Sequence, residues 1–141
     1  MNPFYMLLAI LAGIFTTIEA SVNSQLGKCI TPGIATLHSL MVGMSFILLL
    51  NLINGKLSYY SKITTVKPLW LIGGLFGASI IYLSSRSIPQ LGISNTIILV
   101  LSGQLLSGLI LDAIVNQVEL SARKIGGLIL FLVGAIIFLK E

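Results

Sequence analysis

The chain has 141 residues, of which 56% are hydrophobic and only 9% are Asp, Glu, Lys or Arg. Soluble globular domains carry about 25% charged residues, so this chain has too few polar groups to cover a surface in water, and we expect lipid to contact much of it. The net charge of +4 does not indicate a nucleic-acid partner, because the basic residues stand singly between apolar segments, without a basic stripe or interleaved aromatic side chains.

Five apolar segments follow one another along the chain, each close to the roughly 20 residues that a membrane-spanning helix needs. They cover approximately residues 4–26, 34–53, 68–85, 91–114 and 124–139. Transmembrane β-strands are shorter and alternate between apolar and polar residues, a pattern that these segments lack. The sequence therefore predicts an all-α integral membrane protein with five transmembrane helices, in a single domain over residues 1–141.

The breaks between the segments contain glycine, proline and lysine. The first segment is too long for the apolar core of a signal peptide and has no basic residue before it, so we expect a mature helix. That helix is predicted to end at Gly27 and Lys28. Residues 54–67 form the longest polar stretch, Pro68 begins the third segment, and residues 86–90 are predicted to form a short turn.

Basic residues in the loops give a weak orientation. An odd number of spans places the two termini on opposite faces of the membrane. The face with the N-terminus would hold five basic residues and the other face three, namely Lys56, Lys62, Lys67, Arg123 and Lys124 against Lys28, Arg86 and Lys140. The positive-inside rule then favours a cytoplasmic N-terminus, and so small a difference would permit both orientations.

Small residues recur within the apolar segments at helical spacing. They are Gly73 with Gly77, Ser39 with Gly43, Gly103 with Ser107, and Gly126 and Gly134 in the fifth segment. Helices in lipid associate by close packing, which small residues permit. We expect these residues to lie at helix contacts, within one chain as the simplest arrangement.

Glu19 lies inside the first segment, seven residues before its predicted end at residue 26, or roughly 10 Å from that end. A carboxylate at the centre of a bilayer costs about 2.5–3.5 kcal/mol on insertion scales. Thr16 and Asn23 share its helical face. We interpret this polar stripe as facing an aqueous or substrate-filled cavity, where Glu19 exchanges a proton for a solute. The alternative is a protonated or hydrogen-bonded carboxyl that holds two helices together.

Further polar residues lie in the third and fourth segments. Gln104 and Asp112 share one face, with Ser107 alongside. Gln104 is the deeper residue and could bind substrate or bridge helices, whereas Asp112, near the segment's end, is either an interfacial acid or a site residue. Tyr82 could stack on a flat cation or bond to a neighbouring helix. The predicted substrate and proton pathway therefore consists of Glu19, Asn23, Gln104, Thr16, Ser107, Asp112 and Tyr82.

No sequence motif indicates catalysis, a cofactor or a metal. The sequence has no nucleophile–base pair, P-loop or dinucleotide-binding glycine motif. Cys29 is the single cysteine, which excludes an intramolecular disulfide and a thiolate cluster. His38 is the single histidine and has no second ligand at helical spacing. We therefore expect no enzyme activity, no cofactor and no metal site.

One ordered set of residues spans the whole chain. It consists of Asn23 with Leu26-Gly27, Ser39 with Gly43, Trp70, Gly73-Gly74, Gly77-Ala78, Pro89-x-Leu91-Gly92, Gly103-Gln104, Ser107, Asp112, Arg123, Gly126 and Gly134. In this order and spacing the chain resembles the small YdcZ-type (DUF606) family of the drug/metabolite transporter superfamily.

The resemblance implies a half-size, five-helix exporter of the inner membrane, whose larger relatives join two such halves as inverted repeats. Related small multidrug transporters form antiparallel dimers around a glutamate of the first helix. YdcZ-type chains often carry glutamine where this chain has Glu19, so proton coupling at this position would not be general to the family.

We therefore expect a secondary transporter in the bacterial cytoplasmic (inner) membrane that exports a small polar or cationic compound in exchange for protons at Glu19. Five helices leave little room for a lined cavity, so its expected partners, besides lipid and substrate, are a second copy, parallel or antiparallel, or another half-transporter. Two opposed copies would recreate an inverted-repeat plan. The alternatives are a passive channel with the same polar lining and a non-transporting accessory subunit.

Overall fold

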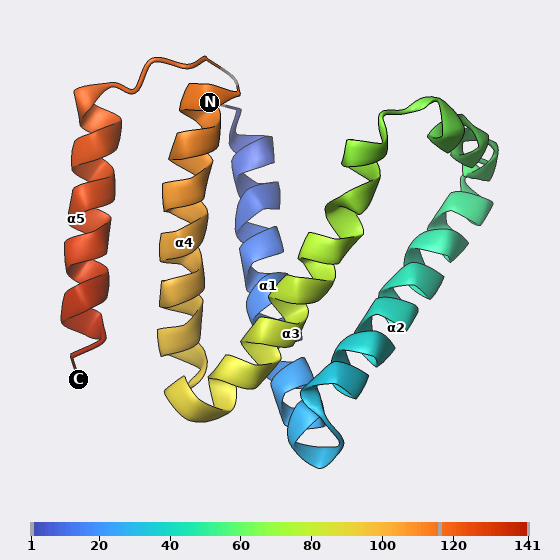
Figure 1. The fold of residues 1–141 in the computed structure, drawn as a ribbon, viewed down its shortest axis with the longest axis horizontal. Helices are drawn as coiled ribbons and strands as arrows, with labels where there is room; N and C mark the ends of the chain where they lie inside the picture. The colour runs from blue at the N-terminus through green and yellow to red at the C-terminus, as the bar shows by residue number, and fades with distance from the viewer. Residues whose placement is uncertain (1, 116, 141) are drawn as a thin grey trace. The chain divides into compact units, whose positions relative to one another are not determined.

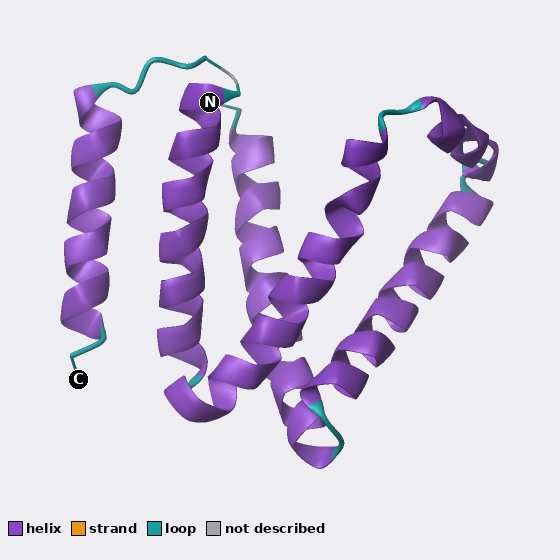
Figure 2. Ribbon diagram, viewed as in Figure 1, coloured by secondary structure: helices purple, strands orange, loops and turns teal. Residues whose placement is uncertain are grey.

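The computed structural model describes residues 2–115 and 117–140. Within these residues the chain is helical and contains no strand (Figure 2). Five α-helices and two 3-10 helices follow in the order α1 (Pro3–Cys29), α2 (Pro32–Ile53), η1 (Leu57–Thr65), η2 (Pro68–Ile72), α3 (Gly73–Leu91), α4 (Ile93–Ile114) and α5 (Ala122–Phe138). The all-helical prediction is confirmed.

The chain divides into two compact units. The first, Met1–Gln90, contains α1, α2 and nearly all of α3, and the second, Leu91–Glu141, contains α4 and α5. Figure 1 shows α1 and α2 meeting at their short connection. The single domain over the whole chain stays a prediction.

Four segments of the described chain are long and apolar enough to cross a membrane, namely α1, α2, Pro68–Leu91 and α4. Most of their large apolar side chains are exposed, and the buried apolar residues of these four segments are few: Ala20, Ala35 and Ile88. This inversion of a soluble protein's burial pattern suits helices that lipid surrounds. Helix α5 has 17 residues, at the short end of the range for a span, so its crossing stays a prediction.

Side-chain caps set where three helices begin. Asn2 Oδ1 accepts a hydrogen bond from the backbone N–H of Phe4 at 3.0 Å, and Thr31 Oγ1 accepts one from Ile34 at 3.2 Å. A proline follows each of these two caps at the first helical position, where its missing N–H has no cost. Ser121 caps α5 with its side chain as well, and these three helices, α1, α2 and α5, start one or two residues earlier than predicted.

The turn predicted at residues 86–90 is wrong, because these residues are helical and α3 continues to Leu91. Pro89 lies in the last turn of α3, so its missing N–H removes only one bond near a helix end. The chain breaks instead at Gly92, with φ +82° and ψ 164°, a backbone conformation open almost exclusively to glycine. Helix α1 likewise runs past its predicted end to Cys29, with Lys28 in its last turn as expected.

Helices α1 and α2 come into close contact at Gly27. A Cβ built on Gly27 would lie 3.3 Å from Pro32 Cα, so only glycine fits this approach without displacing backbone. Ala35 on α2 is fully buried and Ser24 on α1 is as well. This close contact holds α1 and α2 together at their connected ends. The polar residues of α1 lie along the helix from that end.

Candidate functional site

The polar face of α1 borders a small cavity against α3. Its α1 lining consists of Thr16, Glu19, Ala20 and Asn23, and α3 contributes Ile80, Ile81 and Ser84. The cavity measures about 20 Å³, enough for about one water molecule. The spacing of the α1 residues places them on one side of the helix, so the predicted stripe of Thr16, Glu19 and Asn23 lines a single site.

A hydrogen-bond relay connects this stripe to α2. Asn23 Nδ2 donates to Ser39 Oγ at 3.1 Å, and Ser39 Oγ donates to Glu19 Oε1 at 3.3 Å. A hydroxyl can donate and accept at once, which lets Ser39 join an amide to a carboxyl one helical turn away. The relay brings residues of the first and second apolar segments into one polar cluster.

Burial differs sharply along the relay. Asn23 is only 4% exposed, Ser39 is half-buried and Glu19 is exposed. The carboxyl therefore reaches the surface of the chain, while the amide that helps to hold it is enclosed by the chain itself.

Glu19 lies well inside a membrane-spanning helix. Ten residues of α1 follow it, up to and including Cys29, or about 15 Å. Helix α1 has 27 residues and is about 40 Å long, roughly 10 Å more than the hydrocarbon core. With the helix centred in the membrane, Glu19 would lie about 10 Å inside the hydrocarbon.

Each polar group of the cavity has a defined hydrogen-bonding capacity. Thr16 Oγ1 donates to the carbonyl of Ala12 at 2.9 Å, so toward the cavity it offers only an acceptor. Glu19 can accept bonds, or donate one when protonated. Ser84, 7% exposed, adds a hydroxyl from α3. The cluster can bind a proton, a small cation or a solute with N–H or O–H groups.

Two buried hydroxyls lie next in sequence to the cavity residues. Ser24 Oγ and Ser85 Oγ are enclosed and meet no hydrogen-bond partner in the described chain. Such a group costs about 1–3 kcal/mol when it stays unpaired. These are further positions at which a polar molecule inside the unit would gain hydrogen bonds.

Tyr82, predicted for the pathway, lies outside the lining of this cavity. Its ring carbon Cε2 is 4.0 Å from a Cβ built on Gly33, and its hydroxyl accepts a bond from Arg86 Nη1 at 3.5 Å. Its role as a pathway residue stays a prediction.

The predicted residues of the second unit lie along α4. Ser107 Oγ donates to the carbonyl of Gly103 at 2.8 Å, so this hydroxyl forms a hydrogen bond within its own helix. Gln104 is exposed and Asp112 is half-buried, with the carbonyl of Asp112 accepting a bond from Val118 beyond the end of the helix at 3.0 Å. Asp112 thus lies near the end of α4, and Gln104 lies deeper, as the sequence indicates.

The glycines predicted at helix contacts face open space within their own units. A Cβ built on any of them meets no atom within 4 Å, which holds for Gly43, Gly73, Gly77, Gly103, Gly126 and Gly134. Ser39 bonds to Glu19 and Asn23, a role that the spacing to Gly43 did not indicate. Helix packing at these positions stays a prediction.

Ser84 was absent from the predicted site. Helical spacing is the signal that could have indicated Ser84. It lies four residues after Ile80, in a segment with several small residues, so the two side chains share one face of the helix. Which face of α3 meets α1 depends on tertiary contacts that one sequence does not encode in its local pattern.

Metal ligation finds no support in the described residues. No group of three His, Cys, Asp or Glu side chains there is placed to hold a metal ion. His38 on α2 is exposed.

Comparison with known proteins identifies a family for this chain. The family model described as "Putative inner membrane exporter, YdcZ" matches residues 4–137, nearly the whole chain. No curated protein and no solved structure matches.

Proposed function

We propose a transport mechanism for this chain, which belongs to the YdcZ family of inner membrane exporters and is a multi-pass inner membrane protein. In this proposal it exports a small polar or cationic compound in exchange for protons. Glu19 carries the proton, Asn23 and Ser39 hold its carboxyl, and the working unit is a dimer.

The observation that carries the proposal is the exposed, hydrogen-bonded carboxyl of Glu19 inside a spanning helix. Ser39 donates to it at 3.3 Å, and the small cavity lies beside it. Acidic residues within membrane spans are costly, and they commonly mark ion and proton pathways. A structural bridge between two helices would favour an enclosed carboxyl, and Glu19 is exposed.

The exchange follows from the two protonation states of one carboxyl. When ionised, Glu19 accepts a hydrogen bond from the Ser39 hydroxyl and attracts a cation or an N–H donor of the solute. When a proton binds, that attraction is lost and the solute leaves. Because proton and solute compete for one group, each bound form carries one of them across the membrane.

A dimer provides what one chain lacks. The exposed face of Glu19 and the open glycine faces are available to a second copy, and small residues permit close helix contact. An antiparallel arrangement would recreate the inverted-repeat plan of larger transporters. Gln104, Ser107 and Asp112 on α4 remain predicted pathway residues of each copy.

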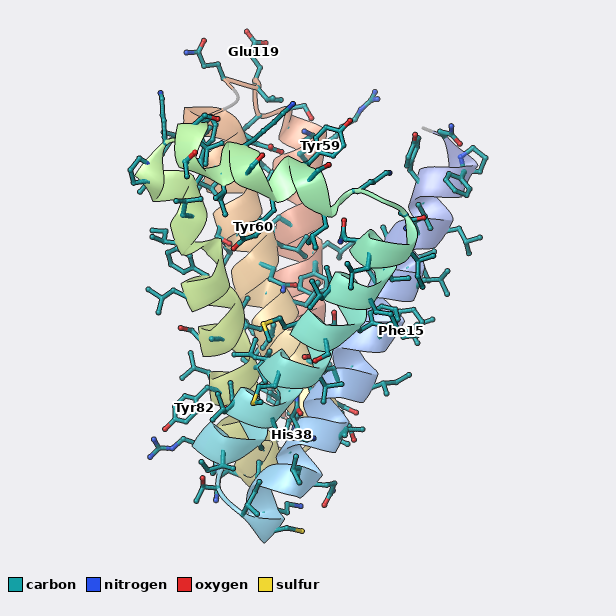
Figure 3. The ribbon with its side chains drawn as sticks, turned by 90° about the vertical axis from the view of Figure 1, so that its right-hand side faces the viewer. Phe15, His38, Tyr59, Tyr60, Tyr82 and Glu119 are labelled. Carbon is teal, nitrogen blue, oxygen red and sulfur yellow. The ribbon has the colours of Figure 1, made fainter. Side chains whose placement is uncertain are left out.

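Transport by reconstituted protein tests the proposal. A thermal-shift screen of purified protein against small cations and amines selects a compound, whose uptake into proteoliposomes is then measured with and without a pH gradient. Glu19→Gln should abolish gradient-driven flux. Glu119→Gln is the matched control, since Glu119 is exposed in the connection between α4 and α5 (Figure 3), and it should transport normally.

Three results would count against this mechanism in different ways. Full gradient-driven flux in Glu19→Gln excludes the coupling role of the carboxyl. Flux that never saturates and ignores the pH gradient indicates a passive channel. Absence of flux, with protein abundance that depends on another membrane protein, indicates an accessory subunit.

A further inference from the structure

A second hollow of the first unit lies far along the chain from Glu19, between the end of α2 and η1. It measures about 460 Å³ and is lined by Met44, Ile47, Leu48, Asn51, Lys56, Leu57, Tyr59 and Tyr60. Its volume falls within the range of small-molecule sites. Neither the proton relay nor the polar face of α1 contributes a residue to it.

The cap of α2 builds this hollow. The backbone N–H of Lys56 donates to the carbonyl of Asn51 at 2.9 Å, and that of Gly55 donates to Leu52 at 3.1 Å. With Gly55 at φ +64°, these two bonds form a Schellman motif. The motif turns the chain back, so that Lys56 and the start of η1 lie beside the last turns of α2.

Polarity changes along the hollow in one direction. Met44, Ile47 and Leu48 lie on one face of α2, five to nine residues before its end at Ile53, or about 8–14 Å below that end. The polar residues Asn51 and Lys56 lie at the end itself. The lining therefore passes from apolar to cationic over about two helical turns.

Depth in the membrane matches this change. Helix α2 has 22 residues and qualifies as a span, so it crosses the hydrocarbon and ends near its boundary. The apolar part of the hollow lies at the level of acyl chains, and Lys56 with the two tyrosines lies at the level of lipid headgroups. Tyr59 and Tyr60 both belong to η1 and both line the hollow, and Figure 3 labels their side chains.

Charge in this region has one sign. Residues 51–72 contain three lysines, Lys56, Lys62 and Lys67, and no Asp or Glu. The ammonium of Lys62 lies 5.0 Å from the ring centre of Tyr59, which holds a second positive charge at the edge of the hollow. Lysine and tyrosine side chains at this depth supply N–H and O–H donors to an anion.

We propose that this hollow binds an anionic phospholipid of the surrounding membrane. An acyl chain lies along Met44, Ile47 and Leu48, and the phosphate pairs with Lys56 and the tyrosine hydroxyls. The basic segment would also gain from the negative surface of the membrane. The proposal is independent of transport and of Glu19.

Lipid binding to the full-length protein tests this. Purified chain in neutral detergent is titrated with phosphatidylglycerol or with phosphatidylcholine of the same acyl chains, and bound lipid is counted by native mass spectrometry. Phosphatidylglycerol should bind more tightly. Lys56→Gln should weaken its binding about fivefold, the effect of one lysine near an anionic surface. Lys28→Gln is the matched control at the end of α1 and should bind normally.

A second variant separates a built site from general attraction to charge. Leu48→Trp fills the apolar part and leaves every lysine in place, so it should also weaken binding of phosphatidylglycerol; Ile47→Trp serves if that variant does not fold. Equal binding of the two lipids overturns the proposal. An equal loss of phosphatidylglycerol binding in Lys28→Gln and Lys56→Gln also overturns it. So does unchanged binding in the tryptophan variant that fills the hollow.

Discussion

Ser39 is the centre of the relay, and its removal gives the sharpest test of the site geometry. Ser39→Ala deletes the acceptor of Asn23 and the donor to Glu19. Side-chain hydrogen bonds in membrane proteins contribute about 0.6 kcal/mol on average and at most about 1.7 kcal/mol. A buried amide left without its acceptor costs about 1–3 kcal/mol, and Asn23 is 4% exposed. We expect the free energy of unfolding to fall by about 1–3 kcal/mol.

Equilibrium unfolding in mixed micelles with a rising fraction of denaturing detergent measures this change. Ser45→Ala is the matched control on the same helix, because Ser45 Oγ donates only to the carbonyl of Met41 at 2.8 Å. It should change stability little. A double-mutant cycle with Asn23→Ala isolates the pair, with an expected coupling of about 0.6 kcal/mol. Zero coupling, or an equal loss in Ser45→Ala, would refute the relay.

Three further predictions concern the backbone and the orientation of the chain. Gly27→Leu should destabilise the protein by about 1–3 kcal/mol through overpacking at the α1–α2 junction, whereas Gly13→Leu, with open space around it, should not; the same unfolding assay compares them. Gly92→Ala should cost about 1–3 kcal/mol because of its positive φ, and Gly108→Ala in the middle of α4 should be neutral or stabilising in that assay. Cys29 is exposed at the end of α1, so a membrane-impermeant maleimide added to intact cells should label about half of it when both orientations occur; complete or absent labelling would contradict dual orientation.

Most of the helical architecture could be predicted from the sequence, because long apolar runs in lipid have few structural options. Helix ends were less predictable. The Pro89 region reads as a turn when proline is taken as a breaker, yet a proline in the last turn of a helix removes little. The helix is interrupted at Gly92 instead, where the backbone has a positive φ. A hydropathy pattern does not indicate such a conformation.

The candidate site was predictable only where it depends on one helix. Thr16, Glu19 and Asn23 share a face by spacing alone, and they line one cavity. The bond from Ser39 to Glu19 joins residues 20 positions apart. Such a contact depends on how α1 packs on α2, which helical periodicity within either segment does not specify. The sequence therefore predicted Ser39 at a helix contact, but it did not indicate the hydrogen bonds of Ser39 to Asn23 and Glu19.

Uneven burial along the relay explains how one group could serve both stability and transport. Asn23 is enclosed by its own chain, while Glu19, one turn earlier on the same helical face, is exposed. Exposure to lipid alone would cost about 2.5–3.5 kcal/mol, a large share of the roughly 5–15 kcal/mol that keeps a typical domain folded. The carboxyl therefore needs water or a second copy beside it. A group that depends on its surroundings in this way changes energy when those surroundings change, and an alternating transporter requires that property of its coupling residue.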